Sequence, residues 1–275
     1  MNGLTNGGMD DSAVYINANG KESQPINIEN CTFNGDATSP DASGVTGILS
    51  TYKVADYVNV DGCSFTNLKY AMYFNDISNA VISNNNVEGT KYTGIYLEPE
   101  ANVTVEQNTL TNIATANYAD PAYSSGVYVG NTDDKDQDKT VANLIIKDNN
   151  VTLNENNTNG VAQGSVNAAE INGTQYATLD AAITAASNGD TVTLLKDVVL
   201  DGTGKGNTEG LLTIQGKNIT LDGNGYTISA EKVSSTPSMI NIQYGANVTV
   251  KNLTIKNLAG AITRHVFLQP QLLMM

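Results

Sequence analysis

The sequence predicts an all-β protein that folds as a right-handed parallel β-helix (solenoid), with one short capping α-helix near residues 178–187. Three observations predict this fold: short aliphatic segments recur along the chain, each has a polar or small bend residue at a fixed place, and a second strand motif lies between them. Such a unit cannot bury its apolar side alone, whereas stacked units can.

The main repeat is an alternating strand, a bend and a second short strand. Its copies are INIENCTF (26–33), VNVDGCSF (58–65), AVISNNNV (80–87), VTVEQNTL (103–110), LIIKDNNV (144–151), LTIQGKNI (212–219) and VTVKNLTI (248–255). The sixth position holds Cys31, Cys63, Asn85, Asn108, Asn149, Lys217 and Leu253, and two residues later come Phe33, Phe65, Val87, Leu110, Val151, Ile219 and Ile255. Stacked coils place equivalent residues about 4.8 Å apart, so we expect the bend asparagines to hydrogen-bond as a ladder.

A second motif precedes the early copies and carries tyrosine. It reads AVYI (13–16), GILS (47–50), AMYF (71–74), GIYL (94–97) and GVYV (126–129). Period-two alternation turns its third residue outward, which aligns Tyr15, Leu49, Tyr73, Tyr96 and Tyr128. The rings either stack on one another and cover the strands, or bind sugar rings, in which case Tyr73, Tyr96 and Tyr128 are the candidate ligand-binding residues.

The order of strand, asparagine bend and strand resembles the pectin-lyase-like β-helix superfamily. The resemblance covers residues 12–153 and 190–257. It implies the fold but no single activity, because that superfamily includes lyases, hydrolases, esterases, phage tailspikes and non-catalytic adhesins.

The repeat lapses in the middle of the chain, which predicts a boundary. We expect a first β-helix of about five coils in residues 1–153, a polar linker in 154–165, and the helix-capped, incomplete start of a second β-helix in 166–275. Thr178 is the expected N-cap of the helix, and Gly189 follows its last turn. This segment resembles the start of β-helix modules in large surface proteins of gut Gram-positive bacteria.

Charge and composition exclude several classes of partner. The chain has 14 Lys+Arg against 28 Asp+Glu, a formal charge of -14, which argues against nucleic acid and anionic membranes. No run of about 20 apolar residues predicts membrane insertion, and the polar residues Met1–Ser12 do not form a signal peptide. We therefore expect an extracellular or cell-surface location as part of a larger exported protein.

Catalytic candidates are few because the chain has one Arg and one His, Arg264 and His265. Asn131-Thr132-Asp133 follows GVYV and resembles a motif of polygalacturonase-type hydrolases, but their second Asp pair, Gly-His-Gly and Arg-x-Lys are absent from 135–263. Carboxylates that follow the tyrosine strand should line one edge: Asp76, Glu98, Glu100 and Asp133. We therefore predict no catalytic residue, and Asp133 and Glu98 are the candidates only if the chain is an enzyme.

Metal and disulfide chemistry each have one candidate site. Asp134, Asp136 and Asp138 alternate as in a calcium loop, although Lys139 replaces the turn glycine; the alternative is a solvated acidic loop. The sequence favours the solvated loop and predicts no cofactor, with calcium as the one candidate. Cys31 and Cys63 share a column, so they either form a disulfide or fill the ladder as free thiols.

These observations favour a non-catalytic extracellular β-helix segment of a bacterial surface protein, acting as an adhesin or stalk. The alternative is a module that binds or degrades carbohydrate, with a host or dietary polysaccharide as its partner. The sequence makes no prediction of the oligomeric state.

Overall fold

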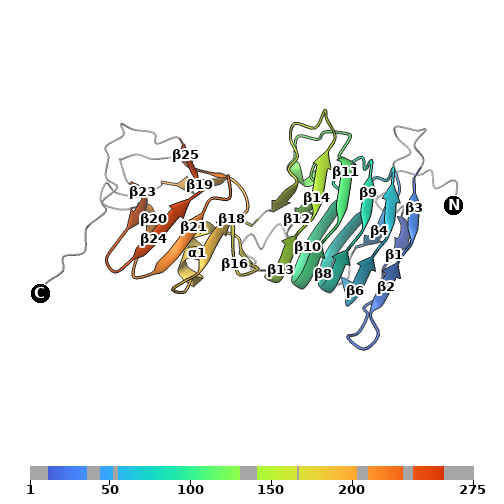
Figure 1. Cartoon of the computed structure of the whole chain (residues 1–275), viewed down its shortest axis with the longest axis horizontal. Coiled ribbons are helices and arrows are strands. Elements are labelled where there is room, and N and C mark those ends of the chain that lie inside the picture. The colour runs from blue at the N-terminus through green and yellow to red at the C-terminus, as the bar shows by residue number, and fades with distance from the viewer. Residues whose placement is uncertain are drawn as a thin grey trace, which may run out of the picture. The chain divides into compact units, whose positions relative to one another are not determined.

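The computed structural model of the chain describes residues 12–35, 44–51, 55–130, 141–165, 167–202, 210–231 and 238–256. The chain divides into two compact units (Figure 1). Unit 1 comprises Met1–Asn167 and Gly173–Ala177, and unit 2 comprises Ala168–Asn172 and Thr178–Met275. Each unit is described separately below.

Unit 1 is a stack of parallel coils, which confirms the predicted fold. One face is formed, in order, by β1 (Ser12–Tyr15), β4 (Thr46–Ser50), β8 (Met72–Ser83), β10 (Ile95–Glu106), β12 (Val127–Val129) and β15 (Gln163–Ser165). The long strand β8 also pairs with β5 (Ala55–Asp56) and β6 (Val58–Asp61), and β10 also pairs with β13 (Ala142–Lys147). Strand β6 in turn pairs with β2 (Ile26–Glu29). A separate sheet contains β3 (Thr32–Asn34), β7 (Ser64–Thr66), β9 (Asn86–Glu88), β11 (Thr109–Ile113) and β14 (Asn150–Leu153). Figure 1 shows these strands side by side, one coil after the next.

The bend residues form the ladder that the sequence predicts. The Asn108 side-chain oxygen accepts from the Asn85 backbone N–H at 3.0 Å and from the Asn85 amide at 2.9 Å. Asn149 repeats this pattern one coil later, accepting from Asn108 at 3.0 and 2.8 Å. Two residues further on, the predicted apolar column is in register: Phe33, Phe65, Val87, Leu110 and Val151.

The cysteines occupy the same ladder as free thiols. The Cys31 backbone N–H donates to the Cys63 sulfur at 3.4 Å, and the Cys63 N–H donates to the Asn85 side-chain oxygen at 2.9 Å. Burial raises the pKa of the Cys63 thiol. Cys63 therefore accepts the hydrogen bond that an asparagine oxygen accepts in later coils.

Asparagine also makes the outer corners of the coils. Asn79, Asn102 and Asn143 have φ values of 46°, 56° and 54°, in the left-handed region that asparagine tolerates better than most residues. Their side chains are linked, because Asn102 donates to Asn79 at 2.8 Å and Asn143 donates to Asn102 at 2.7 Å. The abundance of asparagine thus serves both the inner bend and the outer corner.

The predicted linker lies inside unit 1, which corrects the expected boundary. Strand β15, within residues 154–165, pairs in parallel with β12 through Val127↔Gln163 and Val129↔Ser165. The Asn157 amide donates to the Ser124 carbonyl at 2.8 Å, and the Asn159 amide donates to the Asn117 side chain at 2.9 Å. This polar segment is one more coil, because its asparagines bond to the preceding coil rather than to solvent.

Unit 2 begins with the predicted helix. Strand β17 (Thr174–Tyr176) belongs to unit 1, whereas β16 (Ala169–Ile171) and α1 (Leu179–Ala185) belong to unit 2. The Thr178 hydroxyl accepts from the Ala181 N–H at 3.1 Å, as expected of an N-cap. At the other end, the Lys217 ammonium donates to the carbonyls of Ile183, Thr184 and Ala186 at 2.8, 2.6 and 2.8 Å. Lys217 therefore satisfies carbonyl groups that a helix end leaves unpaired.

The coils of unit 2 do not follow the repeat alignment. The strands are β18 (Thr191–Leu194), β19 (Val198–Asp201), β20 (Gly210–Ile214), β21 (Asn218–Asp222), β22 (Thr227–Glu231), β23 (Ser238–Ile242), β24 (Asn247–Lys251) and β25 (Thr254–Lys256). The structure pairs β20 with β23, β21 with β24 and β22 with β25, all in parallel. The expected equivalence of 212–219 with 248–255 is therefore wrong, and Lys217 and Leu253 do not share a column.

Replacing Val105 by aspartate tests the core. Val105 is fully buried and lies in register between Ile82 and Ile146. Val105→Asp should lower the free energy of unfolding by roughly 3 kcal/mol or more, because it places an unpaired charge in an apolar stack.

The matched control for this substitution is Thr104→Asp. Thr104 is the next residue of β10 and faces outward between Val81 and Ile145, which are both partly exposed. The free energy of unfolding of this control, measured with denaturant, should change little. Equal midpoints for the Val105 variant and the unsubstituted chain would contradict the assigned core.

Candidate functional site

The outward tyrosines form the predicted column on β8, β10 and β12. Tyr73, Tyr96 and Tyr128 are in register, and Leu49 separates them from Tyr15. The ring centroids of Tyr73 and Tyr96 are 4.5 Å apart with an interplanar angle of 6°, and those of Tyr96 and Tyr128 are 5.9 Å apart at 19°. The rings therefore lie nearly parallel and cover much of one another.

A second group of tyrosines, which the sequence analysis missed, lies at the corner before this face. It contains Tyr70, Tyr92, Tyr118 and Tyr123. Tyr70 joins the two groups, with its ring centroid 5.1 Å from Tyr73 and 5.3 Å from Tyr92. A signal was present in the sequence, since Tyr70, Tyr92 and Tyr123 each stand three to five residues before a tyrosine of the column.

The corner that carries Tyr118 and Tyr123 is fixed by local hydrogen bonds. Asp120 caps the short 3₁₀ helix η1 (Pro121–Tyr123), accepting from the Ala122 N–H at 2.9 Å. The Thr93 hydroxyl of the preceding coil donates to the Ala122 carbonyl at 2.7 Å, and the Ser124 hydroxyl donates to the Tyr118 carbonyl at 2.6 Å. These three hydrogen bonds fix the backbone that carries Tyr118 and Tyr123.

Burial is the main cause of the raised pKa values of the tyrosines in and beside the column. It raises the pKa of Tyr73 and of Tyr128 to about 12, and it raises the pKa values of Tyr70 and Tyr96 as well. The charge of Glu98 adds to the effect at Tyr96, whose hydroxyl donates to a Glu98 carboxylate oxygen at 2.9 Å. These four hydroxyls therefore remain protonated at neutral pH, and that of Tyr96 donates a hydrogen bond.

The structure describes one of the two catalytic candidates and none of the calcium candidates. Glu98 lies on β10 at the end of the tyrosine strand, beside Gly130, where an added Cβ would approach the Tyr96 hydroxyl to 2.5 Å. Asp133, Asp134, Asp136 and Asp138 lie outside the described residues, as do Arg264 and His265. Among the described residues, no group of three or more His, Cys, Asp or Glu side chains could hold a metal ion.

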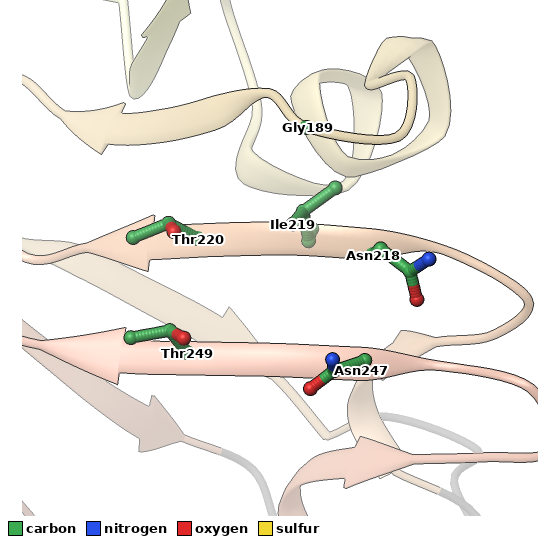
Figure 2. Close-up of a pocket in the computed structure, with 6 residues that line it drawn as sticks. All are labelled: Gly189, Asn218, Ile219, Thr220, Asn247 and Thr249. Carbon is green, nitrogen blue, oxygen red and sulfur yellow. The ribbon is translucent and has the colours of Figure 1, made fainter.

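Unit 2 has a shallow depression of about 180 Å³ on one sheet face. It is lined by Gly189, Asn218, Ile219, Thr220, Asn247 and Thr249. Figure 2 shows matching asparagines and threonines on β21 and β24, which follows from the register Asn218↔Asn247 and Thr220↔Thr249. The depression offers amides and hydroxyls but no ionisable side chain.

The family comparison agrees with this architecture. A family model described as "Right handed beta helix region" matches residues 5–176, more than half of the 275 residues. The chain belongs to this right-handed β-helix family. No curated protein matches the chain. In the part of the chain that the structure describes, no helix is long and apolar enough to cross a membrane.

One solved structure is similar to this right-handed β-helix chain. It is an alginate lyase from Paenibacillus sp. str. FPU-7, with 13% sequence identity, a TM-score of 0.41, and coverage of 88% of this chain and 87% of that chain. The similarity is too low to bear on activity.

Alkaline titration tests the buried column. Tyrosine in an unfolded chain ionises near pH 10, whereas Tyr73 and Tyr128 ionise near 12 when folded. Above about pH 10 the unfolded state loses these protons first, so these two tyrosines should leave stability unchanged below that pH and should lower it between about pH 10 and 12.

Ultraviolet titration of tyrosinate measures the effect. The folded chain should show a late group of tyrosines that is absent in denaturant. A single transition near pH 10 for every tyrosine would contradict the packing of the column.

Proposed function

We propose that the chain is a non-catalytic, extracellular β-helix segment of a bacterial surface protein, serving as a stalk or adhesin. The observation that carries the proposal is the continuous side-chain ladder of unit 1, from Cys31 through Asn149. Each rung ties a bend to the next coil, so that the lateral faces keep a fixed geometry. A rigid rod with fixed faces suits the display of a surface at a distance from its anchor.

The packing of the tyrosine column supports a structural role for Tyr73, Tyr96 and Tyr128. Tyr73 and Tyr96 turn their ring faces on each other at 4.5 Å. Tyr128 leans over Gly164 of the next coil, where an added Cβ would lie 2.9 Å from the Tyr128 ring. These contacts use the ring faces that a sugar would need.

Carbohydrate binding is the second candidate function, and a specific observation favours it. Tyr118 and Tyr123 remain 47% and 43% exposed, although they contact each other and adjoin the buried column. Exposed aromatic rings held in place by a rigid scaffold are typical of surfaces that bind another molecule. A host or dietary polysaccharide is the partner that we propose for this function.

A degradation assay tests the non-catalytic part of the proposal. Pectin and host glycans incubated with the purified chain should release neither reducing ends nor unsaturated uronates. Without a positioned partner base or cation, a lone carboxylate supplies only a small part of the barrier reduction that glycosidic cleavage requires. Product formation that is lost in Asp133→Asn, but not in Asp120→Asn, would establish an enzyme instead.

Cell labelling tests the proposed location. Antibodies against the purified chain should label intact cells of the organism that encodes it. Labelling that appears only after the cells are permeabilised would contradict an extracellular role and would leave the degradation result unaffected.

A further inference from the structure

We infer that Cys31 and Cys63 are a site of reversible oxidation, at which a disulfide forms between two neighbouring coils of unit 1. The site lies at the start of the bend ladder, where the sequence holds cysteine in place of asparagine. This chemistry is independent of carbohydrate binding and can be measured on the purified chain. The proposed extracellular location would supply the oxidising conditions in which such bonds persist.

The backbone holds the two cysteines next to each other. Strands β3 and β7 are parallel and pair Thr32 with Ser64, the residues that directly follow the cysteines. The Ser64 N–H donates to the Cys31 carbonyl at 2.8 Å, so the two bends are also joined by a backbone hydrogen bond. Neighbouring strands are about 4.8 Å apart, and a disulfide needs Cα atoms about 4.4 to 6.8 Å apart. The spacing of the coils therefore allows a disulfide without movement of the backbone.

The Cys63 sulfur lies against the backbone of the coil that carries Cys31. It accepts from the Cys31 N–H at 3.4 Å and donates to the Ile28 carbonyl at 3.4 Å. The Cys31 sulfur donates to the Glu29 carbonyl at 3.3 Å, so both sulfur atoms contact the short stretch 28–31. Because the Cys31 side chain is exposed, it can turn toward the Cys63 sulfur by changing its χ1 rotamer.

The cysteine rung is weaker than the asparagine rungs of the ladder. The Asn108 side-chain oxygen accepts two hydrogen bonds from Asn85, at 3.0 and 2.9 Å. The bond that the Cys63 sulfur accepts from Cys31 is 3.4 Å long, and sulfur is a weak acceptor. In the reduced chain, this rung therefore holds its two coils together less tightly.

The coil that carries Cys31 is also the less buried of the two. Ile26 and Ile28 of β2 are partly buried, whereas their partners on β6, Val58 and Val60, are fully buried. A covalent link between the bends would fasten this coil to the next one. It would also restrict the unfolded chain, which is the main way in which a disulfide stabilises a fold.

A disulfide compound such as glutathione disulfide is the oxidant. The Cys31 thiolate attacks one sulfur of this reagent, which forms a mixed disulfide and releases one glutathione thiolate. The Cys63 thiolate then attacks the Cys31 sulfur, which forms the Cys31–Cys63 bond and releases the second glutathione. The two cysteines give up two protons and two electrons, which convert the reagent to two glutathione thiols. Burial raises the pKa of the Cys63 thiol, so the exposed Cys31 reacts first.

Mass spectrometry tests whether the bond forms. The full chain incubated with glutathione disulfide should lose the mass of two hydrogen atoms and both free thiols, and dithiothreitol should restore them. A peptide digest of the oxidised chain should contain one linked pair that carries Cys31 and Cys63. A chain that keeps both thiols, or that stops at a glutathione adduct on Cys31, would overturn the inference.

Two single variants test the order of attack. Cys63→Ser keeps the exposed thiol and should stop at one glutathione adduct on Cys31. Cys31→Ser keeps the buried thiol, which should react with the reagent about tenfold more slowly or less, because it is shielded and less ionised. Thermal unfolding in reducing buffer checks that each variant keeps its fold. Equal rates in the two folded variants would contradict Cys31 as the residue that reacts first.

The redox equilibrium of the unsubstituted chain tests whether the fold favours the bond. If oxidation stabilises unit 1, the folded state favours oxidation by the same factor. The disulfide of the folded chain should therefore persist at a ratio of reduced to oxidised glutathione about tenfold or more above that for the chain in denaturant. The denaturant midpoint should rise on oxidation and return after reduction. Equal redox equilibria in the folded and denatured chains would overturn the inference and leave the proposed stalk role intact.

Discussion

The hydrogen bond between bend side chains of adjacent coils is the interaction on which the rest of unit 1 depends. Asn108 uses its whole amide: its oxygen accepts from Asn85, and its NH₂ donates to the Ile82 and Glu106 carbonyls and to Asn149. A buried amide with that many partners rigidly fixes the position of the chain at the bend. Because this bend fixes where the following strand begins, it also fixes the register of the apolar column that lies two residues later.

The surface features follow from the same register. With every coil in phase, tyrosines that recur at one place in the repeat must meet on one face, which produces the stack of Tyr73, Tyr96 and Tyr128. The corner before that face changes in length from coil to coil, so its tyrosines do not form a parallel stack, and Tyr118 and Tyr123 stay exposed. The regular part of the coil therefore builds the scaffold, and the irregular part carries the exposed tyrosines.

The sequence predicted the ladder and the tyrosine column because both occupy a fixed position within a recurring strand pattern, although the distance between copies varies. It did not predict the group of tyrosines at the corner, since the corner that contains Tyr118 and Tyr123 is an insertion whose path depends on contacts such as Thr93 with Ala122. The polar pattern of residues 154–165 predicts a linker, yet asparagine side chains bind this segment to the preceding coil. In unit 2 successive coils are about 29 residues apart, as the pairing Asn218↔Asn247 indicates. The alignment of 212–219 with 248–255 places equivalent residues 36 apart and therefore missed that period.

The most direct test of the ladder is Asn108→Leu, which keeps the approximate shape of the side chain and removes every hydrogen bond that the side chain makes. It should lower the free energy of unfolding by about 2 to 5 kcal/mol, because several buried polar groups of neighbouring coils lose their partner. The control is Asn27→Leu, which removes one exposed bond to Asn59 and should cost about 0.5 kcal/mol or less. Denaturant unfolding of both variants decides the matter: a large loss confined to Asn108→Leu supports the ladder, whereas equal stability of the two variants would contradict it.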